Sequence, residues 1–130
     1  NKEGVYMKNK NLLHSFKYAF TGIHSSVKKE RNIKIHISIM LLVIIMGLLL
    51  KINYHEWLTC LVLFALVLSS ELINTAIEIT LNLITTEINP HVKHAKDISA
   101  GAVLINAIFS AIIGLIIFIP KIINLISLHK

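Results

Sequence analysis

Three apolar stretches, each about as long as a membrane-spanning helix, dominate this chain of 130 residues. The first, from Ile35 to Leu50, carries no charged residue, and its only polar residues are His36 and Ser38. A helix needs about 20 mostly apolar residues to cross the hydrocarbon core of a bilayer, so each stretch is long enough to span a membrane. The sequence therefore predicts an all-α integral membrane protein.

The composition supports this fold class. Apolar residues make up 55% of the chain, charged residues make up 15%, and the mean hydropathy is +0.70, which is too apolar for a soluble domain of this size. The length fits a single domain over residues 1–130. The net charge of +6 could indicate a nucleic-acid partner, but the basic residues flank the apolar stretches. Attraction to anionic lipid explains that placement better, so we expect membrane lipids and no nucleic acid as partners.

We predict four helices, an amphipathic one at 12–29 and membrane-spanning ones at 33–52, 57–84 and 98–119. Residues 12–29 place apolar side chains on one helical face and mostly basic or small polar side chains on the other. A basic amphipathic helix beside a membrane span is typical of a helix that lies in the membrane interface. We therefore expect a surface helix followed by a bundle of three spans.

The last span is predicted to have Asp97 as its N-cap and to stop at Pro120. Asn106 falls near the middle of this span, where we expect its side chain to hydrogen-bond a neighbouring helix. Small residues also recur four positions apart, a spacing that lets membrane helices approach closely. These pairs are Ala107 with Ala111 and Ser110 with Gly114.

The distribution of basic residues predicts the orientation in the membrane. Ten of the 13 Lys and Arg residues lie before Ile35 or between Thr85 and Asp97. Because basic residues concentrate in cytoplasmic segments, we expect the N-terminus and the loop before Asp97 in the cytoplasm and the C-terminus outside. The other three basic residues are Lys51, Lys121 and Lys130.

The second predicted span carries two carboxylates, Glu71 and Glu78, which share one helical face with Asn74 and Asn82. An ionisable residue within a membrane helix indicates function by default, since its burial costs several kcal/mol. At a rise of about 1.5 Å per residue, the two carboxylates lie about 10 Å apart along the helix axis. A single Mg²⁺ ion, with ligands at about 2 Å, cannot bind both. We therefore expect two roles, one in metal binding and one in accepting a proton.

Charged residues at the ends of the other spans should reach the same cytoplasmic interface; these are Glu30, Arg31, Lys96 and Asp97. Carboxylates, a metal ion and basic groups at one surface suit phosphoryl transfer. However, the chain has neither a P-loop nor the glycine-rich loop of protein kinases. The residues alone thus predict a metal or proton site near the cytoplasmic face. They leave open a proton-coupled transporter, and a non-catalytic scaffold in which the polar residues only hold the helices together.

A longer motif is more specific. Glu71-Leu-Ile-Asn74-Thr-Ala-Ile-Glu78, followed 18 residues after Glu78 by Lys96-Asp97, resembles the signature of the prokaryotic diacylglycerol kinase family. The resemblance covers nearly the whole chain, and it implies an ATP-dependent lipid kinase.

Two further segments are similar to the undecaprenol kinases, the Gram-positive branch of that family. They are Glu30-Arg31-Asn32 before the first span and Gly114-Leu-Ile-Ile-Phe-Ile-Pro120 at the end of the last. The resemblance implies undecaprenol as the lipid acceptor, with diacylglycerol as the alternative. It also implies a homotrimer in the bacterial cell membrane, with active sites shared between neighbouring protomers and MgATP as the phosphoryl donor.

The resemblance assigns roles to individual residues. It implies that Glu30 and Glu78 bind Mg²⁺ on ATP, that Glu71 is the general base on the lipid hydroxyl, and that Asn74 orients the transferred phosphoryl group. Besides the two metal ligands, the implied nucleotide contacts are Tyr18, Glu87, Asn89, Lys96 and Asp97.

The sequence departs from the family pattern at three positions. Asn11 stands where an Arg that contacts phosphate or lipid is common, and Lys10 is a candidate substitute. Asn82 stands where Asp is common. Ala100 replaces a Ser of the diacylglycerol-preferring enzymes, which favours a different lipid acceptor.

Overall fold

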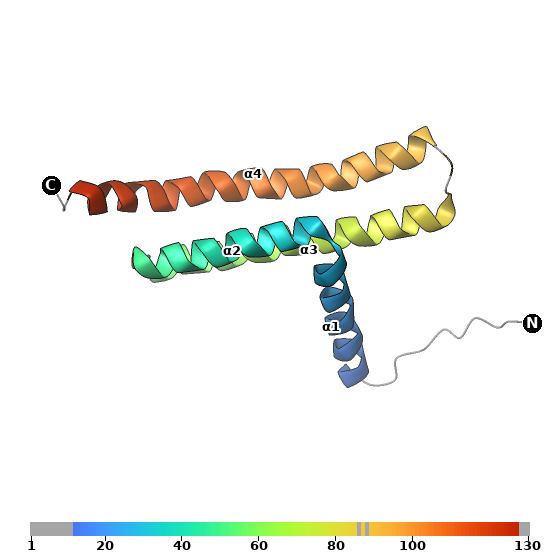
Figure 1. The fold of residues 1–130 in the computed structure, drawn as a ribbon, viewed down its shortest axis with the longest axis horizontal. Helices are drawn as coiled ribbons and strands as arrows, with labels where there is room; N and C mark the ends of the chain where they lie inside the picture. Colours follow the sequence, from blue (N-terminus) through green and yellow to red (C-terminus); the bar gives the residue numbers. More distant parts are fainter. Residues whose placement is uncertain (1–11, 86, 88, 128–130) are drawn as a thin grey trace, which may run out of the picture.

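The computed structural model describes residues 12–85, 87 and 89–127, and this part of the chain forms four helices (Figure 1). They are α1 (Leu12–Lys29), α2 (Arg31–Leu49), α3 (Tyr54–Ile84) and α4 (Pro90–Ser127). Of these described helices, α2, α3 and α4 are long and apolar enough to cross a membrane. The prediction is therefore confirmed in that the described part of the chain is all-helical and has three helices that could span a membrane.

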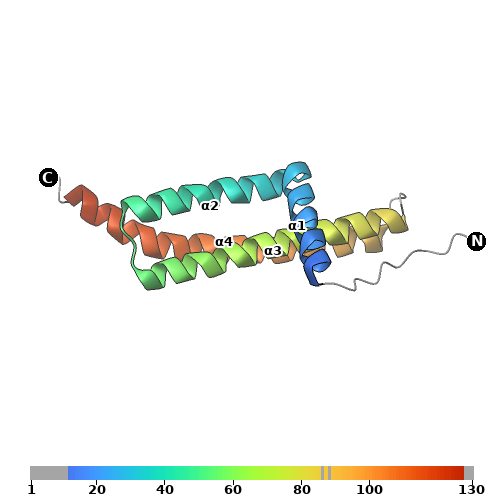
Figure 2. The same cartoon turned by 90° about the horizontal axis from the view of Figure 1, so that it is seen from below.

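The three long helices run side by side, and α1 lies crosswise to them next to the start of α2 (Figures 1 and 2). α3 is the central helix, because it packs against both α2 and α4. α3 and α4 continue together beyond the level of α1 to the connection at residues 85–89. The polar motif of α3 thus lies where the three long helices meet α1.

The opposite end of the bundle is fixed by a tight turn and by polar contacts. Lys51 has a positive φ of 50° in the turn between α2 and α3. Asn53 and Glu56 then form a capping box at the start of α3, which satisfies two backbone N–H groups that the helix leaves unpaired. Glu56 also forms an ion pair of 3.0 Å with Lys121 of α4. This end of α3 is therefore tied to both neighbouring helices.

α2 packs closely on Trp57 of α3 at Gly47, which is buried. A Cβ atom at this position would lie 2.8 Å from Cη2 of Trp57 and 3.0 Å from Cδ1 of Ile52. The absence of a side chain lets the indole ring lie directly against the α2 backbone. Gly47 thus sets the spacing between the two helices at this end.

Replacing Gly47 with Ala is expected to destabilise the protein by about 1–3 kcal/mol, the usual cost of adding a methyl group to a full site. The matched control is Gly114→Ala, because a Cβ at Gly114 would meet nothing within 4 Å. Reversible unfolding of both variants in the same detergent measures the difference. Equal stabilities would show that the Trp57 ring moves aside without cost.

The predicted start of the last helix is wrong. α4 begins at Pro90, and Oδ1 of Asn89 accepts a hydrogen bond of 2.9 Å from the backbone N–H of His91. Asn before Pro is a strong start signal, since Asn caps the helix and Pro suits its first position. Asp97 is accordingly not the N-cap; it lies inside the helix and pairs with Lys93 at 2.7 Å.

The predicted stop at Pro120 is also wrong, because α4 continues through it to Ser127. Pro removes one backbone hydrogen bond from a helix, but long apolar helices tolerate that loss where local adjustments satisfy the freed carbonyl. The helix therefore extends past the end predicted for the span.

Asn106 behaves as predicted. Its Nδ2 donates a hydrogen bond of 3.4 Å to the backbone oxygen of Leu66, which joins α4 to α3. The small residues of α4 behave differently, since they line an apolar groove between α2, α3 and α4 rather than a tight helix contact within the chain. That groove is part of the site described next.

Candidate active site

Glu71 lies at the centre of the polar motif and is only 3% exposed. Its Oε1 atom lies 3.2 Å from Nε2 of His36, which comes from α2. A buried carboxylate is costly unless it is paired or hydrogen-bonded, so the imidazole is the group that stabilises it here. The packing of α2 on α3 provides this contact.

Asn74, one turn further along α3, connects α3 to α4. Its Oδ1 accepts a hydrogen bond of 2.6 Å from the hydroxyl of Ser99, and its Nδ2 donates one of 3.2 Å to Oε1 of Glu78. The Ser99 hydroxyl also lies 3.0 Å from the backbone oxygen of Lys96. The amide of Asn74 therefore has a fixed orientation, with its N–H group directed to Glu78.

A cavity of about 260 Å³ opens beside Glu71 and Asn74. We call it the polar cavity because these two side chains line it, although the greater part of its wall is apolar. Ala100, the residue that departs from the family pattern, lines this cavity together with both polar side chains. The other lining residues are Asn32, His36, Val103, Leu104 and Ala107. A small polar group placed in this cavity would lie next to the Glu71 carboxylate.

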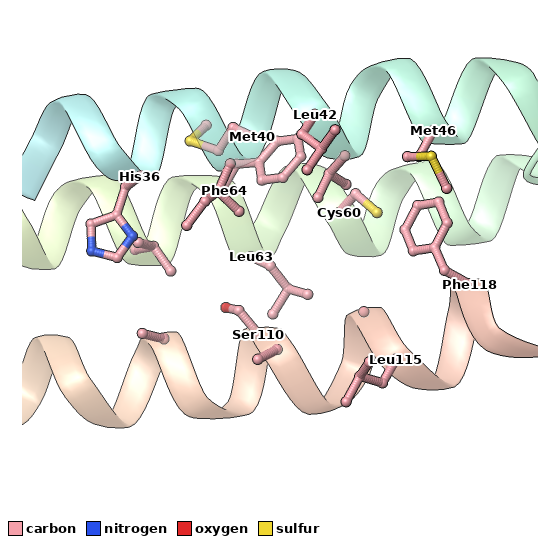
Figure 3. Close-up of a pocket in the computed structure, with 16 residues that line it drawn as sticks. His36, Met40, Leu42, Met46, Cys60, Leu63, Phe64, Ser110, Leu115 and Phe118 are labelled. Atoms are coloured by element: carbon pink, nitrogen blue, oxygen red, sulfur yellow. The ribbon is translucent and has the colours of Figure 1, made fainter.

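An apolar groove of about 470 Å³ lies between α2, α3 and α4 (Figure 3). Figure 3 shows His36 at one end of the groove and Met46 and Phe118 at the other. His36 and Ala107 line both the groove and the polar cavity, so the two spaces adjoin. The cavity that Glu71 lines thus opens next to an apolar groove, with His36 and Ala107 between the two spaces.

Two polar pairs lie beyond Glu78, on the segments of α3 and α4 that lead to the connection at residues 85–89. Nζ of Lys96 donates a hydrogen bond of 2.6 Å to Oδ1 of Asn82, and Lys93 pairs with Asp97. Asn82, which stands where Asp is common in the family, thus still accepts a hydrogen bond from Lys96. Lys96 thus contacts α3 one turn beyond Glu78, whereas the exposed pair of Lys93 and Asp97 lies within α4.

Other predicted residues lie at the edges of this region. Tyr18 is exposed on α1, with its ring centroid 6.3 Å from that of His14. Glu30 is the N-cap residue between α1 and α2, and Asn89 caps α4. Glu87 is exposed in the connection between α3 and α4. Asn11, like Lys10, lies outside the described residues.

The predicted metal ligands fit Mg²⁺ in only one respect. Among the described residues, no group of three or more His, Cys, Asp or Glu side chains could by itself hold a metal ion. However, Mg²⁺ in phosphoryl-transfer sites usually has one or two carboxylate ligands, and phosphate and water oxygens supply the rest. Glu30, at the N-cap of α2, and Glu78, within α3, have ligands of that chemistry, and their joint binding of Mg²⁺ stays a prediction.

The sequence reading did not single out His36 and Ser99, which both contact the polar motif. His36 carried a signal, because it is the only ionisable residue between Ile35 and Leu50, and such a residue is a functional candidate. Ser99 carried no such signal, because serine is common near the end of a predicted span. Its contact with Asn74 follows from the register of α4 against α3.

Comparison with known proteins gives consistent matches. Residues 17–118 match the family described as prokaryotic diacylglycerol kinase. The undecaprenol kinase of Bacillus subtilis is 44% identical over 107 residues, which cover 82% of this chain and 87% of that protein. A diacylglycerol kinase of Synechocystis is 34% identical over 116 residues, which cover 88% of this chain and 66% of that protein.

Proposed function

This chain belongs to the prokaryotic diacylglycerol kinase family, and from that membership we propose that it transfers the γ-phosphoryl group of MgATP to undecaprenol. The product, undecaprenyl phosphate, would serve as a carrier lipid for cell-wall precursors. The family resemblance inferred from the polar motif is thereby confirmed. It favours a membrane lipid kinase over the proton-coupled transporter and the non-catalytic scaffold.

The observation that carries the proposal is that the polar cavity, which Glu71 lines, adjoins the apolar groove at His36 and Ala107. A lipid alcohol has the matching shape, a hydroxyl group at the end of a long apolar chain. With the hydroxyl in the polar cavity beside Glu71, the isoprenoid chain would follow the groove past His36 toward Phe118.

The chemistry follows from the polar contacts. Glu71 removes the proton from the lipid hydroxyl as the hydroxyl oxygen attacks the γ-phosphorus, and the bond to the β-phosphate oxygen breaks to release ADP. Ser99 and Glu78 hold the amide of Asn74, and its second N–H would donate to the transferred group. Glu30 and Glu78 would hold Mg²⁺, which would supply neutralisation of the charge on the phosphates. Tyr18, Lys96 and Asp97, with Glu87 and Asn89 in the connection, would contact the nucleotide.

We further propose that three copies assemble with active sites shared between neighbours. Two observations support this. The described part of one chain lacks a complete metal cluster, and Glu30 lies at the N-cap of α2 whereas Glu78 lies within α3. A neighbour's Glu30 could then complete the site around Glu78.

The location is proposed from charge and polarity. α1 presents exposed apolar side chains such as Leu13, Phe16 and Phe20 together with basic ones, which suits a helix in the membrane interface. We place α1 and the connection at residues 85–89 on the cytoplasmic side of the bacterial cell membrane, where ATP is available. The C-terminus would then lie outside.

Undecaprenol is expected to be phosphorylated with a higher kcat/KM than diacylglycerol. The physical reason is that the cavity beside Glu71 presents the methyl group of Ala100 and the apolar side chains Val103 and Leu104, which suit an alcohol without other polar groups. Transfer of label from γ-labelled ATP to each lipid in the same mixed micelles measures the preference.

A preference for diacylglycerol would overturn the choice of acceptor while leaving the chemistry intact. Ala100→Ser is the informative variant, because it adds a hydroxyl to the cavity wall with little change in volume. We expect it to raise activity on diacylglycerol relative to undecaprenol.

A further inference from the structure

We propose that His36 is a positioning residue for phosphoryl transfer, because its Nε2–H group holds one oxygen of Glu71 and leaves the other directed to the lipid hydroxyl. This inference rests on the proposed function and deepens it. His36 is the residue that the structure brings against the buried carboxylate of Glu71.

The geometry of the pair is specific. Nε2 of His36 lies 3.2 Å from Oε1 of Glu71, and the two residues come from different helices. The Glu71 side chain is 4% exposed and that of His36 is 20% exposed. Both side chains line the polar cavity, so the imidazole reaches the carboxylate from the same space that the hydroxyl would enter.

The chemistry of the two groups explains why an imidazole suits this position. An ionised carboxylate accepts hydrogen bonds at both oxygens, and a freely rotating one would present either oxygen to the substrate. A neutral imidazole donates one hydrogen bond from Nε2 and fixes the carboxylate plane without adding a positive charge. A Lys or Arg partner would bind the carboxylate more strongly as an ion and would reduce its ability to accept a proton.

The position of His36 between the two cavities adds a second constraint. Figure 3 shows the imidazole at the end of the apolar groove, where the chain of the lipid would give way to its hydroxyl. His36 therefore contacts the base on one side and borders the path of the lipid on the other. In this arrangement the proton passes from the hydroxyl to Glu71. His36 orients the Glu71 carboxylate and does not itself take the proton.

A purely structural role would have different consequences. If His36 served only to stabilise a buried carboxylate, its removal would lower the folded fraction, and the molecules that fold would retain normal turnover. A positioning role predicts a loss of kcat in folded protein, because the base must be held within about 0.5 Å of its productive position.

The kinetic experiment compares His36→Leu, His36→Gln and His55→Leu in the assembled protein in mixed micelles. The Leu variant is expected to lose about tenfold to a hundredfold in kcat, typical of a lost outer-shell partner, with KM for MgATP unchanged. His36→Gln should recover most of the activity, since its amide nitrogen can donate to Glu71. His55→Leu, at an exposed site near the start of α3, controls for the loss of a histidine.

Wild-type kcat in folded His36→Leu protein would overturn the proposal. An equal loss of kcat in the folded Leu and Gln variants would also overturn it, because the donor would then be irrelevant.

A second measurement does not depend on activity. In protein with ¹⁵N-labelled histidine, NMR is expected to show His36 protonated at Nε2, and Glu71→Gln should shift its ring resonances while those of His55 stay unchanged. If the ring resonances of His36 do not shift in Glu71→Gln, the proposed contact between the two side chains is refuted. If the wild-type protein phosphorylates no lipid alcohol, the proposed function fails, whereas the NMR result still decides whether His36 holds Glu71.

Discussion

Replacing Glu71 with Gln is expected to reduce phosphoryl transfer to undecaprenol by about a hundredfold to ten-thousandfold, the usual contribution of a general base. The amide keeps the size of the side chain, and its oxygen can still accept the hydrogen bond from His36. It cannot take a proton from the lipid hydroxyl. The variant should therefore fold and bind MgATP like the wild type, so the loss should appear in kcat.

The measurements are label transfer from ATP for kcat and equilibrium nucleotide binding for affinity. Glu56→Gln is the matched control, because it makes the same change at the other end of α3, away from the candidate site. Glu71→Gln protein that retains wild-type turnover would show that another group removes the proton.

Replacing Glu78 with Gln is expected to weaken the apparent affinity for MgATP by at least about tenfold, which corresponds to about 1.4 kcal/mol. The Gln oxygen can still accept the hydrogen bond from Nδ2 of Asn74, so the local geometry should persist. What is lost is the negative charge, and Mg²⁺ favours charged oxygen ligands. The Mg²⁺ concentration for half-maximal activity should rise.

Titration of activity with Mg²⁺ at a fixed ATP concentration measures this effect, and Glu30→Gln should act in the same direction. Glu56→Gln again serves as the control, since its carboxylate pairs with Lys121 at the far end of the bundle. An unchanged Mg²⁺ requirement in Glu78→Gln would exclude this carboxylate as a metal ligand. Together, the Glu71 and Glu78 variants separate proton transfer from metal binding.

The sequence predicted the helices because their determinants are local. Long apolar stretches require helices in a bilayer, since each backbone N–H and C=O group must be paired within its own segment. The ends were harder to predict. The Asn89-Pro90 start signal of α4 was present in the sequence, but the polar residues after it pointed to a later beginning of the span. Pro120 was read as a stop, although the helix continues through it.

The polar motif of the candidate site was also predictable in part. Helical periodicity alone places Glu71, Asn74 and Glu78 on one face, and the helix rise alone separates the two carboxylates. The hydrogen bond from Asn74 to Glu78 joins residues four apart and follows from that periodicity. The division into a base and a metal ligand came from the family resemblance and stays a prediction that the two variants test.

The contacts between helices could not be read from the sequence. The register of α2 against α3 brings His36 to Glu71, and the register of α4 against α3 brings Ser99 to Asn74 and Lys96 to Asn82. Registers depend on side-chain packing along whole helices, such as the contact of Trp57 with Gly47, and no local pattern encodes them. The sequence by itself thus determined three membrane helices with carboxylates on one face of the second. Only the tertiary structure decided that the buried Glu71 has an imidazole partner and lines a cavity that adjoins an apolar groove.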